Sequence, residues 1–254
     1  MSAAPRGVLV TRPEPGTAET AASVAALGWE PVLAPALVLR PREFTIPPVQ
    51  AVLLTSRAAA RGLPLPPAPI PLLAVGEGTA AEARRRGWTQ AEGASGLAED
   101  LARLAAARLD PAAGPLLLAV GQGYSLDLAR TLRGLGFRVI RRIAYAAEPA
   151  RSLPEPAFRA LSAGQVGAVL FHSPRSALCA MTLLRAAGLA ADASRLEVLA
   201  ISQRVADAAA AAIAPLAWRD LHVADRPGEE ALLDLLRRRG EPAAAPGPAT
   251  SGEP

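Results

Sequence analysis

Lysine is absent from the sequence, and all 27 basic residues are arginine. Because this bias accompanies many alanines and prolines, it indicates genomic base composition and not a nucleic-acid-binding protein. The net charge is only +4, and the arginines are spread along the chain. No nucleic-acid partner is therefore predicted. Guanidinium groups do bind carboxylates well, which favours an anionic small-molecule substrate.

Cysteine and histidine are also scarce. The single cysteine, Cys179, excludes an internal disulfide bond and is expected to be a core residue. His172 and His222 are distant in the sequence, so no cluster of metal ligands is predicted. The glycine-rich motifs of dinucleotide-binding proteins, P-loop proteins and serine hydrolases are likewise missing.

Long apolar runs are missing as well. The composition is 51% hydrophobic, yet no run approaches the 18 residues that a membrane span needs. The first seven residues lead directly into an expected strand, which leaves no room for a signal peptide. We therefore expect a cytoplasmic protein with no membrane partner.

Apolar segments that read as strands alternate with segments that read as helices. This alternation predicts an α/β fold with parallel sheets. One expected strand, 138–149, is longer than most strands and rich in Val and Ile. The other expected strands are 8–11, 32–40, 51–55, 72–75, 116–120, 166–171, 196–201 and 221–224.

The sequence repeats itself. The segment 28–41 recurs 108 residues later as 136–149, with Gly, Ala and Pro at matching places. Further on, 51–60 resembles 168–177 and 73–80 resembles 199–206. Chance similarity between alanine-rich segments is the alternative. Three matches in the same order favour a duplicated unit of about 7–110 and 115–239.

The repeat predicts a bilobal molecule. If the two long strands cross between lobes, they can pair as a two-stranded β linker, and the ligand site lies in the inter-lobe cleft at the carboxyl ends of the strands. The segment 241–254 contains mostly Pro, Ala and Gly and is expected to be disordered. The predicted parts are lobe one at 1–35 plus 150–240, lobe two at 41–140, and the linker strands at 36–40 and 141–149.

Small polar residues and glycines follow the expected strands, directly before helices. Free backbone N–H groups at helix N-termini attract anions there. Each residue also has a structural explanation as a helix cap or a turn. His172 can act as an acid or base, although local hydrogen bonding is its more usual role. The candidate substrate-binding residues are Thr11, Arg12, Ser56, Arg57, Gly76, Thr79, Gly121, Ser173, Arg175 and Ser202.

Tyr145 is the candidate catalytic residue. It is one of two tyrosines in the chain and lies on the long strand 138–149. A phenol can donate a proton or a hydrogen bond to a leaving oxygen. The alternative is an ordinary half-buried strand tyrosine.

Six segments together resemble the uroporphyrinogen-III synthase family, in that family's order: VLVTRPEPG (8–16), LLTSRAAA (53–60), LLAVGEGTAAEA (72–83), GFRVIRRIAYAAEP (136–149), VLFHSPRSAL (169–178) and LAISQRVADAA (199–209). The resemblance implies a monomeric enzyme with two α/β lobes and a two-stranded linker. Such enzymes close the linear tetrapyrrole hydroxymethylbilane, which has eight carboxylates, with loss of water and inversion of ring D. The product is uroporphyrinogen III, and no metal or cofactor is implied.

The resemblance also implies roles for single residues. Tyr145 matches the tyrosine proposed to assist departure of the hydroxyl, and Thr79 matches a threonine near the cleft. Ser56, Ser173 and Arg175 match further positions of the motifs. Two positions depart from the pattern: Val120 replaces an arginine found in many members, and Arg204-Val205 replaces a Thr-Thr pair found in some. One carboxylate contact is therefore expected to be lost or replaced.

Two other functions remain open at this point. One is a non-catalytic bilobal module that binds a tetrapyrrole or another anion. The other is an unrelated sugar- or nucleotide-binding protein, against which the missing phosphate-binding motifs count.

Overall fold

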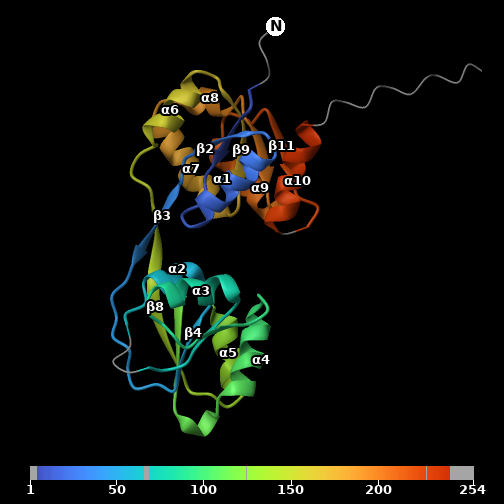
Figure 1. The fold of residues 1–254 in the computed structure, drawn as a ribbon. Helices are drawn as coiled ribbons and strands as arrows, with labels where there is room; N and C mark the ends of the chain where they lie inside the picture. Colours follow the sequence, from blue (N-terminus) through green and yellow to red (C-terminus); the bar gives the residue numbers. More distant parts are fainter. Residues whose placement is uncertain (1–4, 66–68, 124, 227, 241–254) are drawn as a thin grey trace, which may run out of the picture. The chain divides into compact units, whose positions relative to one another are not determined.

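The computed structural model of the chain describes residues 5–65, 69–123, 125–226 and 228–240 (Figure 1). It divides into two compact units, one formed by Met1–Leu37 with Pro149–Pro254 and the other by Val38–Glu148. The expected tail 241–254 lies outside the described residues. The linker role of 36–40 and 141–149, and the cleft, stay predictions.

The first unit has a five-stranded parallel sheet in the order β11-β10-β9-β1-β2. β1 and β9 lie in its centre, and every residue of both strands is buried. A parallel sheet covered by helices on both faces needs such continuous apolar strands. The strands are β1 (Gly7–Val10), β2 (Glu30–Leu33), β9 (Val166–Phe171), β10 (Glu197–Ala200) and β11 (Asp220–Val223).

Helices cover both faces of this sheet because alternate strand residues point to opposite sides. Val8 and Val10 share one buried cluster with α1 (Gly16–Ala26) and α10 (Glu229–Gly240). Leu9 and Val169 share the other cluster with four helices, the shortest of which contributes Ala193. These elements are α6 (Glu155–Ser162), α7 (Pro174–Ala186), α9 (Gln203–Ile213) and the short α8 (Ala190–Ala193).

The second unit has a six-stranded sheet in the order β3-β8-β7-β4-β5-β6, in which the ladders from β8 to β6 are parallel. α2 (Arg57–Arg61) and α3 (Glu77–Arg85) cover one face, and α4 (Ala98–Arg108) and α5 (Leu126–Gly134) cover the other. A 3₁₀ turn spans Pro111–Ala113. The strands are β3 (Leu37–Pro41), β4 (Ala51–Leu54), β5 (Leu72–Ala74), β6 (Ala91–Gly93), β7 (Leu116–Gly121) and β8 (Val139–Pro149).

The α/β prediction with parallel sheets is confirmed, but the expected single strand 32–40 is wrong. That segment forms two strands, β2 and β3, which belong to different sheets. Pro35 lies between them and has no N–H to donate to a ladder. The flanking Ala34 and Ala36 instead donate to the carbonyls of Val10 and Thr11, each at 2.9 Å. The three-residue strand β6 was not predicted, because its sequence Ala-Glu-Gly carries no apolar pattern.

The two sheets repeat one strand order. β2-β1-β9-β10-β11 in the first unit corresponds to β8-β7-β4-β5-β6 in the second. The pairing of Val8 with Pro31 recurs 108 residues later as that of Leu116 with Val139. Each sheet therefore combines strands from both halves of the chain, as Figure 1 shows by the mixture of colours in each unit.

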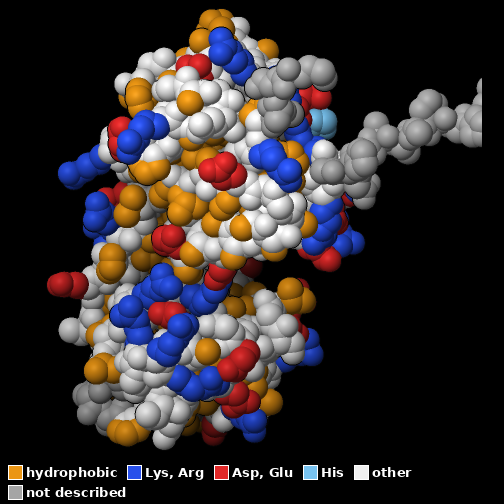
Figure 2. All heavy atoms as spheres, turned by 45° about the horizontal axis from the view of Figure 1, so that its top comes forward, with side chains coloured by type: hydrophobic (Ala, Val, Ile, Leu, Met, Phe, Trp, Pro, Cys, Tyr) orange, Lys and Arg blue, Asp and Glu red, His pale blue; other side chains and the backbone are white. Residues whose placement is uncertain are grey.

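A cluster of arginines around Glu82 joins α2 to α3. The Glu82 side chain is 8% exposed and accepts hydrogen bonds from Arg61 at 3.2 Å and from Arg85 at 2.7 Å. Burial alone would raise the pKa of Glu82, but Arg61, Arg85 and Arg86 outweigh it and lower that pKa. Basic and acidic side chains are interspersed in this way over the face shown in Figure 2. The Arg61–Glu82 hydrogen bond links the last residue of α2 to α3.

Candidate active site

Ser56 and Tyr145 meet at the carboxyl ends of the strands in the second unit. Ser56 is the N-cap of α2, and its Oγ accepts the Ala59 N–H at 3.2 Å. The same hydroxyl donates to the phenol Oη of Tyr145 at 3.3 Å. Tyr145 is half-buried and packs against the cluster on the α2–α3 face. The cap of a helix and a strand side chain thus form one polar pair.

A β-bulge directs Tyr145 to this face. The β7–β8 register shifts between Val120 and Gly121, so that Val120 pairs with Ile143 and Gly121 pairs with Tyr145. The extra residue, Ala144, accepts a hydrogen bond at 2.9 Å from the backbone N–H of Arg42. Bulges commonly redirect a side chain next to a functional site.

Gly121 lies directly against the Tyr145 ring. A Cβ added at Gly121 would be 2.6 Å from Cζ of Tyr145 and 2.7 Å from its Oη. Real Cβ atoms do not approach other atoms so closely, so only glycine leaves room for the ring in this position.

A second hydroxyl pair lies on the neighbouring loops. Ser125 Oγ donates to Thr55 Oγ1 at 3.1 Å. Ser125, the residue before α5, has a φ of 61°, which non-glycine residues rarely adopt. Strained backbone of this kind often occurs at functional sites. No sequence signal identified Ser125 or Thr55 as partners, because the bond joins two loops that only the sheet order makes neighbours.

The remaining candidates of this unit lie at the same edge. Gly76 is the N-cap of α3, and Thr79 is buried in the first turn of that helix. Arg57 is the first residue of α2 and is half-buried. The first turns of α2 and α3 direct backbone N–H groups to this edge, where an anion would be stabilised.

In the first unit the carboxyl ends of the strands carry charge. Arg12, just after β1, forms an ion pair with Glu229 at the start of α10. Thr20 donates to the same carboxylate and also accepts from Arg12 at 3.2 Å. Burial would raise the pKa of Glu229, but Thr20 and Arg12 lower it. Arg12 therefore already has a carboxylate partner within the protein.

His172 lies beside this ion pair. Both of its ring nitrogens are buried and have no hydrogen-bond partner among the described residues. Burial, followed by the charge of Arg12, lowers the pKa of His172 to about 4, against an opposing effect of Glu229. The imidazole is consequently neutral at physiological pH. A neutral side chain with this pKa is a poor proton donor there.

The other candidates of the first unit are helix caps and neighbours of caps. Ser173 is the N-cap of α7 and accepts the Ser176 N–H at 3.1 Å. Arg175 follows in the first turn and is exposed, and Ser202 is the N-cap of α9. Thr11 is fully buried and donates to the Leu170 carbonyl at 2.8 Å. Arg175 is the most accessible cation of this set.

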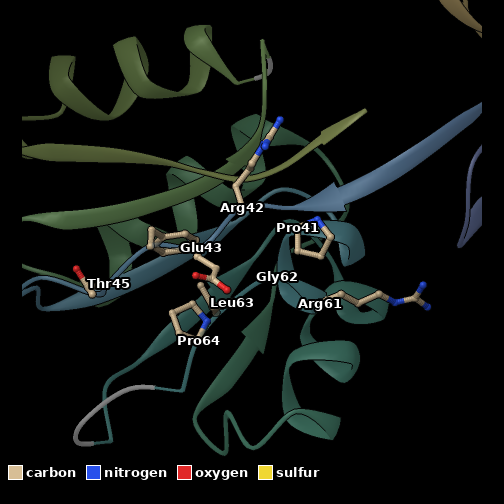
Figure 3. Close-up of a pocket in the computed structure, with 9 residues that line it drawn as sticks. Pro41, Arg42, Glu43, Thr45, Arg61, Gly62, Leu63 and Pro64 are labelled. Carbon is tan, nitrogen blue, oxygen red and sulfur yellow. The ribbon is translucent and has the colours of Figure 1, made fainter. Parts of the chain in front are cut away.

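A cavity of about 630 Å³ lies in the second unit, between the chain after β3 and the end of α2. In Figure 3, Glu43, Leu63 and Pro64 lie together, whereas Arg42 and Arg61 extend away from them. None of the candidate site residues lines this cavity. Over the described part of the chain, no group of three His, Cys, Asp or Glu residues is arranged to hold a metal ion.

Comparison with known proteins identifies the family. The model of the family described as uroporphyrinogen-III synthase HemD matches residues 18–234, which is most of the chain.

The chain belongs to the uroporphyrinogen-III synthase family.

Solved structures of uroporphyrinogen-III synthases are also similar. The synthetase from Helicobacter pylori is 14% identical over 92% of this chain and 99% of that chain, with a TM-score of 0.55, so the two share a fold. A mutant synthase from the extremely thermophilic bacterium Thermus thermophilus is 21% identical over 91% of this chain and 97% of that chain, with a TM-score of 0.43. No curated protein matches the chain.

Within this uroporphyrinogen-III synthase fold, the structure brings together Ser56, Gly121 and Tyr145 of the predicted set. It also reveals Glu229 and Thr20 as partners of Arg12, which sequence reasoning missed. Glu229 follows Gly228 at the start of a helix, a common place for an acidic residue, so its sequence position gave no signal of a distant partner.

Proposed function

We propose that this protein is a cyclising hydro-lyase that converts hydroxymethylbilane to uroporphyrinogen III, with loss of water and inversion of ring D. Family membership over residues 18–234 supports the reaction. The Ser56–Tyr145 pair supports the location of its chemistry. The family match does not favour the alternative of a non-catalytic binding module.

In the proposed reaction a pyrrole nitrogen lone pair expels the terminal hydroxyl of the substrate. Tyr145 donates its phenolic proton to that oxygen, which leaves as water. The electron-rich pyrrole supplies most of the driving force, so one weak acid suffices. The phenolate regains a proton when the closed ring loses one.

Positioning is the larger task for the protein, because the flexible linear substrate must close with one ring inverted. Eight carboxylates give many points of attachment. The first turns of α3, α7 and α9 offer backbone N–H groups, and Arg57 and Arg175 offer guanidinium groups. Thr79 and Ser202 complete the proposed contacts.

The proposal also covers the localisation, the oligomeric state and the cofactor requirement of the enzyme. It is a cytoplasmic monomer that needs no cofactor and takes a small-molecule tetrapyrrole as substrate. No described helix is long and apolar enough to cross a membrane. Size-exclusion chromatography with light scattering tests the oligomeric state.

A coupled assay tests the reaction. Hydroxymethylbilane is generated in situ, the purified protein is added, and the oxidised uroporphyrin isomers are separated. An excess of the type III isomer over a protein-free control is the expected result. Type I alone, from a protein that is folded by circular dichroism, would end the proposal.

A further inference from the structure

We infer that Ser56, Gly121 and the β-bulge at Ala144, opposite Val120–Gly121, form a seat that fixes the phenol of Tyr145. In this tyrosine seat, Ser56 and Gly121 are positioning residues that act through Tyr145 and not contacts for the substrate. The catalytic consequence rests on the proposed function, whereas the geometry of the seat stands without it.

The β-bulge determines on which face of the sheet the Tyr145 ring lies. Val139 packs on the α4–α5 face, and strict alternation along the strand would send residue 145 to the same face. The register shift inserts one residue, and Ala144 and Tyr145 both pack on the α2–α3 face. The Tyr145 carbonyl is held by the N–H of Gln122 at 2.9 Å. The backbone therefore presents the phenol toward Ser56.

Gly121 leaves the space that the ring occupies. The three atoms that an added Cβ would approach most closely all belong to the Tyr145 side chain, at 2.6, 2.7 and 2.9 Å. The backbone of Gly121 does not lie in the left-handed region, so alanine fits the backbone. An alanine here acts by displacing the phenol.

Ser56 fixes the oxygen of the phenol. Its own oxygen is held by the Ala59 N–H, which leaves the hydroxyl hydrogen to point at Tyr145 Oη. A hydrogen bond donated to that oxygen stabilises the negative charge that develops as the phenol gives up its proton. Ser56 thereby links the orientation of Tyr145 to the cap of α2.

The decisive variant is Gly121→Ala. We expect kcat to fall by roughly 10²-fold, the loss expected when a single proton donor is removed, with little change in KM. The double variant Gly121→Ala/Tyr145→Phe should be no slower than Tyr145→Phe alone, because both changes remove one function. Gly134→Ala is the matched control, since an added Cβ at Gly134 in α5 has no atom within 4 Å. A wild-type kcat in Gly121→Ala would overturn the inference.

A stability cycle tests the seat independently of activity. Gly121→Ala should lower the denaturation midpoint in the wild-type background, where the ring is present. The loss should disappear in the Tyr145→Ala background, and Tyr145→Leu serves the same purpose if the alanine variant does not fold. An equal loss in both backgrounds would refute the seat. If the wild-type protein forms no type III product, the proposed function is refuted. The seat is still tested in that case, because the denaturation measurements need no substrate.

Discussion

The two units share one strand order, yet the carboxyl ends of their strands carry different chemistry. The second unit presents neutral hydroxyl groups, in the pairs Ser56–Tyr145 and Thr55–Ser125. The first presents the Arg12–Glu229 ion pair beside His172. A repeated backbone therefore fixes where polar residues can lie, while substitutions at equivalent positions decide what each place can do.

Two serines at equivalent positions of the two units show how their chemistry differs. Ser56 and Ser173 both cap the helix that follows the strand, at 3.2 and 3.1 Å from the N–H that they accept. Only Ser56 also contacts a phenol. β8 runs unbroken through Tyr145, whereas the corresponding stretch 28–41 is interrupted at Pro35 and forms two strands of different sheets. The unbroken strand is what carries a tyrosine to the end of its sheet.

The largest expected effect is that of Tyr145→Phe, which removes the phenolic proton and keeps the ring. We expect kcat to fall by roughly 10²-fold if the proton donor lies in the second unit. Single-turnover formation of type III isomer measures this loss. Arg175→Gln in the first unit is the control, because it should alter KM more than kcat. If Tyr145→Phe keeps the wild-type rate, Tyr145 is not the proton donor, and the two units do not differ in this catalytic role.

The next effect concerns pH and belongs to the first unit. The pKa of His172 is about 4 in the folded protein, below its ordinary value of 6.5. Between these pH values the unfolded chain binds a proton that the folded protein does not, so stability must fall as the pH is lowered from about 6.5 to about 4.

We expect this loss to amount to about 3 kcal/mol of the free energy of unfolding, and to be absent in His172→Gln. Urea denaturation at a series of pH values measures it. Arg12 and Glu229 are the charged neighbours, so the ion-pair variant Glu229→Gln should lower the pKa of His172 further. A His172→Gln profile that matches the wild type would contradict this account.

A smaller effect separates the two serine caps. Ser56→Ala and Ser173→Ala should each lower the free energy of unfolding by about 1 kcal/mol, the usual cost of losing an N-cap. Only Ser56→Ala should also lower kcat, since only that hydroxyl reaches Tyr145. Ser56→Thr keeps the hydroxyl and should retain activity. If both alanine variants keep the wild-type kcat, Ser56 and Ser173 act only as helix caps.

The smallest effect is expected at the C-terminus. Deleting 241–254 should leave both kcat and the thermal midpoint unchanged, because the composition of this segment predicts no packed structure. Differential scanning calorimetry and the isomer assay measure the two quantities. A fall of several degrees would show that the segment packs on one of the units.

The sequence by itself determined the α/β class, the parallel strands and the caps that follow them. These features depend on local signals, namely apolar runs, turn residues and serine before a helix, and they identified Ser56, Ser173 and Tyr145 as candidates. Pro35 was also a readable signal, and it explains why the expected strand 32–40 is two strands.

Only the tertiary structure decided which of these residues meet. The Arg12–Glu229 pair joins opposite ends of the chain, and the Ser125–Thr55 bond joins two loops of neighbouring strands. The bulge that turns Tyr145 toward Ser56 is a matter of register between β7 and β8. Register and distant contacts depend on how whole strands align, which no local pattern of residues encodes.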